Sequence, residues 1–103
     1  MSADGEWQPL AITIEGTVIA VSGELDVATA PELHDTLSRT DGEPVHLDLS
    51  GVSFIDPAGL RVLLTAKRDI DARGGQLVIR NPSWQVRRIA RVSGTADDLG
   101  VAN

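Results

Sequence analysis

The chain has 103 residues, of which 42% are hydrophobic and only 3% aromatic, so its length and composition predict one domain with an aliphatic core. The absence of cysteine excludes disulfides and thiolate chemistry, and a net charge of −6 disfavours direct binding to nucleic acid, which requires a basic face. No apolar run approaches the ~20 residues of a membrane span, and the N-terminus lacks the features of a signal peptide, so we expect a cytoplasmic protein without membrane insertion.

The negative charge is concentrated in the first third of the chain. Residues 1–38 contain seven acidic residues and no Lys or Arg, whereas residues 39–103 contain nine basic and eight acidic residues. Such an acidic segment can steer a basic protein partner, although it is more often an ordinary solvated surface.

The first predicted elements form a β-hairpin. Residues 1–9 are predicted to be a flexible N-terminal tail, followed by a single domain over residues 10–103. Alternation of isoleucine with polar residues predicts a strand over 11–15, and a Gly-Thr turn leads into a second strand over 18–22. The short gap between the two strands favours antiparallel pairing.

A helix is predicted to begin near Thr29. Thr29 and Glu32 have the spacing of a capping box, and Pro31 lies in the first turn, where its missing N–H has no cost. Asp41-Gly42 is predicted to end this unit. Three apolar residues recur at helical spacing and predict the buried side of the helix: Ala30, Leu33 and Leu37.

The clearest strand covers residues 45–49, where aliphatic residues alternate with His46 and Asp48. Residues 50–55 are predicted to be a loop. Asp56 then provides an N-cap, and Pro57 the first residue, of a helix that runs to about residue 73 and ends at Gly74-Gly75. Its buried stripe is predicted to consist of Leu60, Leu63, Ala66 and Ile70.

The last predicted elements are a strand over 76–80 and a helix that begins with the N-cap and proline of Asn81-Pro82. This helix is predicted to turn its three arginines outward and four residues inward, Val86, Ile89, Ala90 and Val92. Alternation of strands and helices after the hairpin predicts parallel strand pairs joined by right-handed crossovers. The fold class is therefore α/β, with a mixed central sheet of about four strands and helices mainly on one face, since the strands are not continuously apolar.

No residue pattern predicts catalysis. His34 and His46 are not flanked by acids at ligand spacing, so we expect no metal site. The chain contains neither a Gly-x-Ser-x-Gly nucleophile elbow nor a glycine-rich phosphate loop. We therefore predict a protein that is not an enzyme and needs no cofactor.

Three segments give the chain a family resemblance. They are Gly23-Glu24-Leu25-Asp26 at the end of the second strand, Thr29-Ala30-Pro31-Glu32-Leu33 at the start of the first helix, and LDLSGVSFIDPAGL from Leu47 to Leu60. Together they resemble the STAS family, the domain of bacterial anti-sigma factor antagonists and of sulfate transporter tails. The resemblance spans about residues 10–99, nearly the whole chain.

The resemblance implies a regulatory role. An anti-sigma factor antagonist of this family binds an anti-sigma factor of the histidine-kinase-like ATPase type, which frees a sigma factor and regulates transcription by partner switching. The switch is usually a phosphorylatable Ser directly after the Asp that precedes the helix. Here that position is Pro57, followed by Ala58, so the usual switch cannot operate at this position.

The resemblance also implies where a partner binds. We expect Asp26 and Asp56 to lie close together, because both follow the carboxyl ends of neighbouring strands. Structural roles are the alternatives: Asp26 in an Asx turn, Asp56 as N-cap, Gly59 for close packing and Arg61 as a solvated charge. The predicted partner-binding residues are Asp26, Asp56, Pro57, Ala58, Gly59, Leu60 and Arg61.

Two other functional classes stay open. One is a STAS subunit of a membrane transport complex, such as a lipid ABC transporter or an anion transporter. The other is a nucleotide-binding or enzymatic domain, which no phosphate loop supports. A weak homodimer also stays open beside the predicted anti-sigma factor partner.

Overall fold

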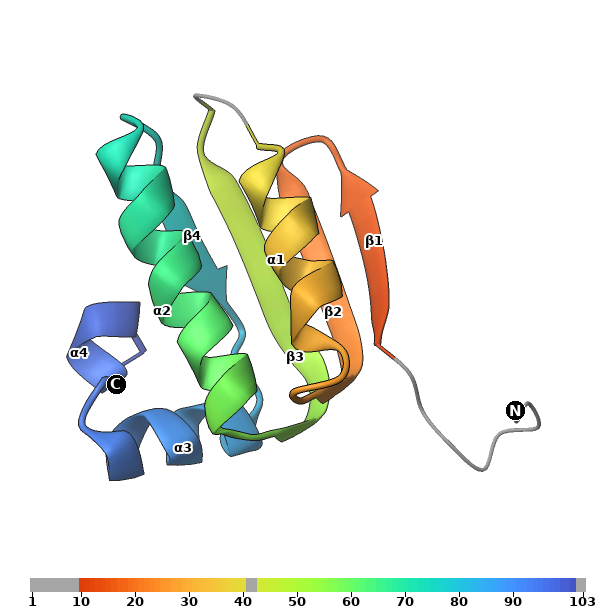
Figure 1. Cartoon of the computed structure of the whole chain (residues 1–103), viewed down its shortest axis with the longest axis vertical. Helices are drawn as coiled ribbons and strands as arrows, with labels where there is room; N and C mark the ends of the chain where they lie inside the picture. The colour runs from red at the N-terminus through yellow and green to blue at the C-terminus, as the bar shows by residue number, and fades with distance from the viewer. Residues whose placement is uncertain (1–9, 41–42, 102–103) are drawn as a thin grey trace.

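The computed structural model describes residues 10–40 and 43–101, which fold into a sheet covered on one side by helices (Figure 1). The predicted tail at 1–9, the predicted helix end at 41–42 and residues 102–103 lie outside the described residues. The elements in chain order are β1 (Ala11–Glu15), β2 (Val18–Leu25), α1 (Ala30–Ser38), β3 (Val45–Ile55), α2 (Pro57–Ala72), β4 (Leu77–Arg80), α3 (Trp84–Ser93) and α4 (Ala96–Leu99).

The four strands lie side by side in the order β1-β2-β3-β4. β1 and β2 form the predicted antiparallel hairpin, in which Ala11 lies opposite Ser22. β2, β3 and β4 run parallel to one another, and β2 and β3 end together with Leu25 opposite Ile55. Parallel neighbours require crossover connections, which α1 and α2 provide. The predicted mixed α/β sheet is therefore confirmed.

Alternation along the central strands explains why one face of the sheet is covered. In β3, Leu47 and Leu49 are fully buried, whereas His46 and Asp48 point to the other face and stay partly exposed. Figure 1 shows α1 and α2 lying along the covered face. The buried side chains of the described residues are all aliphatic, and the largest are Leu25, Leu33, Leu37, Leu47, Leu49, Leu63, Ile70, Leu77 and Leu99.

β3 is longer than predicted, since residues 50–55 continue the strand instead of forming a loop. Glycine and serine in this segment are typical of loops, but β2 runs beside it and pairs Gly23 with Val52. Gly51 allows the strands to approach closely, because a Cβ at this position would lie 2.6 Å from the Ser22 Cβ. Backbone pairing with β2 therefore overrides the local composition.

α1 begins at Ala30, but the capping box predicted for Thr29 and Glu32 is wrong. Thr29 forms no side-chain bond that caps the helix. Its hydroxyl instead accepts a hydrogen bond from the Asp26 backbone N–H at 3.0 Å and donates to the Glu24 carbonyl at 2.7 Å. Thr29 therefore stabilises the turn between β2 and α1.

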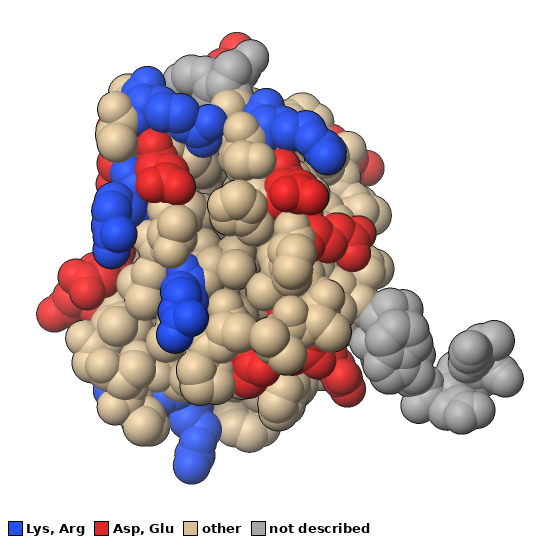
Figure 2. All heavy atoms as spheres, in the orientation of Figure 1, with Lys and Arg blue, Asp and Glu red and all other residues tan. Residues whose placement is uncertain are grey.

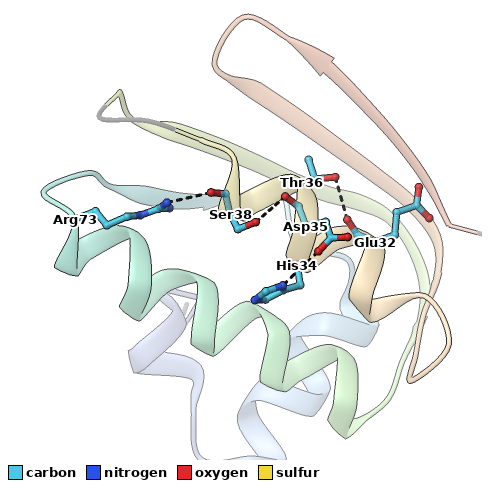
Figure 3. A network of polar contacts seen from close by, with 6 residues as sticks. All are labelled: Glu32, His34, Asp35, Thr36, Ser38 and Arg73. Carbon is cyan, nitrogen blue, oxygen red and sulfur yellow. Dashed lines mark hydrogen bonds and ion pairs between the residues drawn. The ribbon is translucent and has the colours of Figure 1, made fainter.

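α2 agrees with its prediction along its whole length. Asp56 is the N-cap, and Gly74 follows the helix with a positive φ of 85°. At this far end the Arg73 guanidinium donates a hydrogen bond to the Ser38 carbonyl at 3.1 Å, which joins the ends of α1 and α2 (Figure 3). The predicted buried stripe is confirmed at all four positions, Leu60, Leu63, Ala66 and Ile70.

α3 begins two residues later than predicted. Its N-cap is Ser83, whose hydroxyl accepts a hydrogen bond from the Val86 backbone N–H at 3.4 Å. Asn81-Pro82 therefore does not cap the helix, and Asn81 turns the chain before it with a φ of 48°. Val92 was predicted to face inward but is exposed, and the short α4 was not predicted.

Candidate functional site

The carboxyl ends of β2 and β3 bring the two predicted site segments together. Leu25 lies opposite Ile55, so Asp26 and Asp56 follow these strands at the same edge of the sheet. The backbone N–H of Asp56 also donates to the Leu25 carbonyl oxygen at 3.2 Å. The structure thus brings the two residues to neighbouring positions, as expected.

The Asp56 side chain connects α2 to the loop after β2. One carboxylate oxygen, Oδ1, accepts a hydrogen bond from the Gly59 N–H at 2.9 Å and caps the helix. The other, Oδ2, accepts one from the Val27 N–H at 3.2 Å. Asp56 therefore fixes the position of Val27 relative to the first turn of α2.

The Asp26 side chain stabilises the turn in which it lies. Its Oδ1 accepts hydrogen bonds from the backbone N–H groups of Ala28 at 3.0 Å and Thr29 at 3.1 Å. The Thr29 hydroxyl approaches the same oxygen to 3.2 Å. This is the Asx turn that the sequence left as an alternative, so Asp26 shapes the loop that carries Val27.

Gly59 and Leu60, two of the predicted contact residues, are buried and do not lie on the accessible surface. A Cβ on Gly59 would lie 2.5 Å from the Leu25 carbonyl oxygen and 3.1 Å from Ile55 Cγ1, so only glycine lets α2 approach the sheet this closely. Leu60 is buried in the core. Both residues support the surface from beneath.

The accessible part of the site consists of Val27, Pro57, Ala58 and Arg61, here called the docking surface. Pro57 and Arg61 are exposed and Ala58 is partly exposed, while Val27 exposes 72% of its surface. No hydrogen bond or ion pair joins the Arg61 side chain to another described residue. Val27 was missed from the sequence, because a single valine after a strand has no periodic signal.

A shallow groove of about 440 Å³ between α1 and α2 continues the docking surface. Figure 2 shows this side of the molecule, where charged groups of both signs are scattered among uncharged ones. A groove of this kind offers apolar contact area with isolated charges, which suits a protein segment. Its lining includes Val27, Pro31, His34, Ala58, Arg61 and Val62.

The open face of the sheet carries a separate polar cluster around Asp48. Its Oδ1 accepts hydrogen bonds from the Ser50 backbone N–H at 2.9 Å and from the Ser50 hydroxyl at 2.8 Å. These bonds, with smaller contributions from Asn81 and Arg80, lower the pKa of Asp48 below its usual value of 3.8. The Asn81 side chain donates to Asp48 Oδ2 at 3.4 Å, so the cluster ties the end of β4 to β3.

Residues 10–40 and 43–101 contain no group of three His, Asp or Glu side chains that could hold a metal ion. None of the helices within the same ranges combines the length and apolar composition that crossing a bilayer requires.

Known proteins resemble this chain over most of its length. An anti-sigma-B factor antagonist of Listeria monocytogenes is 31% identical over 88 residues, which cover 82% of this chain and 77% of the relative. The structure of an anti-sigma factor antagonist from Mycobacterium paratuberculosis aligns with a TM-score of 0.66 at 26% identity, over 87% of this chain and 80% of that one. Unphosphorylated SpoIIAA, also an anti-sigma factor antagonist, shares the fold with a TM-score of 0.67 at 20% identity, over 85% and 83% of the two chains.

A sequence model of a protein family also matches this chain. The model described as "Mlab, STAS domain" matches residues 10–101, which includes every strand and helix of the structure. The strand order and the matched length agree with this assignment. The chain belongs to the STAS domain family.

Proposed function

We propose that this protein is an anti-sigma factor antagonist of the bacterial cytoplasm. It binds an anti-sigma factor of the histidine-kinase-like ATPase type and thereby frees a sigma factor, without catalysing a reaction or contacting nucleic acid itself. The naming of its relatives as anti-sigma factor antagonists supports this role. The observation that carries it is the docking surface at the start of α2, held in place by Asp56.

The chemistry of the site favours binding over catalysis. Both carboxylates accept hydrogen bonds from backbone N–H groups, so they hold the loop and the helix rather than face a substrate. The side chains that remain accessible are apolar, apart from the Arg61 guanidinium. Exposed apolar residues around one arginine are typical of a protein interface, in which arginine is enriched at the energetic centre.

Control of the proposed complex does not use a phosphate at the start of α2. Neither Pro57 nor Ala58 has a hydroxyl group, so a kinase has no acceptor there. Pro57 also fixes the backbone of the first helical turn, since its ring restricts φ. We propose that the docking surface stays competent for binding, and that partner switching depends on the state or amount of the anti-sigma factor.

The experiment that tests the function measures binding to purified anti-sigma factors of this ATPase type from the source organism, one at a time, by calorimetry. Pro57→Glu places a carboxylate in the docking surface, and a buried unpaired charge should weaken the complex by about 2 kcal/mol or more, about thirtyfold in Kd. The fold should persist, because glutamate is tolerated in a first helical turn.

Pro44→Glu is the matched control. Pro44 is exposed directly before β3, at the end of this strand opposite to the docking surface, and should bind the partner like the parent protein. Thermal unfolding of each variant checks that it is folded. Equal affinity of Pro57→Glu and the parent would show that the partner docks elsewhere. Binding to a transporter ATPase instead of any anti-sigma factor would favour a transport-complex subunit.

A further inference from the structure

A second accessible surface lies at the same end of the molecule and contains the aromatic residues of the described chain. The core is aliphatic, yet Phe54 is 49% exposed and Trp84 is 67% exposed. Val92, one of the residues that the helical pattern placed inward, is 77% exposed. Aromatic side chains are the largest contributors to binding energy at interfaces, so their placement outside the core indicates a contact role.

These side chains form a hollow rather than a flat patch. The space between the end of β3 and the outer side of α3 has a volume of about 380 Å³ and is lined by Phe54, Trp84, Gln85, Arg88, Ile89 and Val92. We call it the α3 hollow. A concave apolar surface of this kind fits a projecting side chain of a protein segment.

The helix that forms one wall of the α3 hollow is anchored to the rest of the domain. α3 is anchored beneath by Val86 and Ala90, which are fully buried. At its start the Ser83 backbone N–H donates to the Leu49 carbonyl at 3.2 Å, which fixes the helix to β3. A preorganised site binds with a smaller loss of conformational entropy, so exposed aromatics on this helix can contribute much of their contact energy.

The charge of α3 defines the chemistry of the occupant. The helix contains three arginines and no acidic residue, although the whole chain has a net charge of −6. Arg88 lines the hollow and Arg91 is exposed on the same helix. A local basic site on an acidic protein attracts a carboxylate on a short segment but disfavours nucleic acid or an anionic membrane, whose many charges would meet the acidic remainder.

The α3 hollow and the docking surface lie at the same end of the molecule, on either side of the buried Ile55. This residue lines the hollow, and its Cγ1 also lies against Gly59 beneath the first turn of α2. Asp56 and Pro57 follow directly in the chain. Figure 1 shows α3 and the N-terminal end of α2 at the same end of the molecule. One partner can therefore contact both surfaces.

We infer that the α3 hollow is a second contact site for the anti-sigma factor and receives an apolar segment of that protein bearing a carboxylate, which pairs with Arg88. This inference rests on the proposed function and adds a second contact to the docking surface at the same end of the molecule. Trp84 supplies the main apolar contact, and Arg88 sets the preference for an acidic segment.

The test uses Trp84 as its own reporter. Because the chain has two tryptophans, Trp7→Phe leaves Trp84 as the single emitter. Titration with the purified anti-sigma factor should shift the Trp84 emission to shorter wavelength, since binding removes the indole from water. The same protein is titrated with anionic phospholipid vesicles and measured at rising concentration of its own chain. A shift that occurs with vesicles or self-association and not with the anti-sigma factor overturns the inference in favour of those occupants.

Affinity measurements separate this inference from the proposed function. Trp84→Ala should weaken the complex about thirtyfold, as expected for an aromatic hot spot, while Ile14→Ala, an exposed apolar residue on β1, should leave it unchanged. Arg88→Glu should weaken the complex more than Arg68→Glu does. Arg68→Glu is the control, because it makes the same charge reversal at an exposed residue in the middle of α2. If Pro57→Glu abolishes binding but Trp84→Ala and Arg88→Glu bind like the parent, the function stands and the α3 contact is refuted. If the parent binds no anti-sigma factor, both are refuted.

Discussion

Asp56→Ala tests whether one side chain organises the docking surface. The substitution removes the cap on α2, which stabilises helices by about 1 kcal/mol. It also removes the acceptor of the Val27 N–H bond, a charge-assisted bond of about 1 kcal/mol at an exposed site. We therefore expect a loss of about 2 kcal/mol in the free energy of unfolding, or about 10 °C in Tm for a domain of this size.

The assay is urea denaturation with the slope and midpoint fitted separately, beside two comparison variants. Asp56→Asn keeps one carbonyl acceptor and should lose about half as much. Asp69→Ala removes an equal charge from an exposed position of α2 whose side chain makes no hydrogen bond with the described residues, so it should change stability by less than about 0.5 kcal/mol. If Asp56→Ala is as stable as Asp69→Ala, the two hydrogen bonds do not organise the site and the reasoning fails.

Three further predictions follow from single contacts. Asp26→Ala should lower stability by about 1–2 kcal/mol, because Oδ1 accepts two backbone N–H bonds, and an unchanged Tm would refute this structural role. Gly59→Ala should cost about 1–3 kcal/mol by overpacking against the Leu25 carbonyl, despite alanine's higher helix propensity; chemical denaturation that shows a stabilised variant would contradict the close approach. Because hydrogen bonds from Ser50 lower the pKa of Asp48, this carboxylate stabilises the fold above pH ~4, and its contribution is lost as the pH falls through the lowered pKa. Asp48→Asn should therefore be less stable than the parent at neutral pH, and the difference should shrink in unfolding measurements toward pH 2.

Local signals in the sequence were sufficient to predict α2 and the class of the fold. The buried stripe of α2 and its Asp56 cap depend on residues within one or two turns, and such interactions form wherever the helix is placed. The hairpin and the parallel pairs likewise follow from the alternation of apolar residues and the lengths of the connections. The position of Asp26 beside Asp56 was predictable, because it follows from strand order alone.

The bounds of β3 and the role of Thr29 were decided by contacts that the local pattern does not reveal, between strands and across a turn. The sequence of 50–55 is typical of a loop, and only the hydrogen bonds offered by β2 hold it in β3. Thr29 has the spacing of a capping residue but binds the carbonyl of Glu24 across a turn.

The exposure of side chains on α2 and α3 also depends on tertiary packing as well as on the local sequence pattern. Helical periodicity identifies the apolar side of α2 correctly, but in α3 it placed Val92 inward, and the packing of Val86 and Ala90 against the sheet leaves Val92 in solvent. The sequence alone determined the order of the strands and of the three longer helices and the cap of α2, because these depend on neighbours along the chain. The tertiary structure decided that Gly59 and Leu60 are buried while Val27 and Trp84 are accessible, because burial depends on which distant segments cover a side chain.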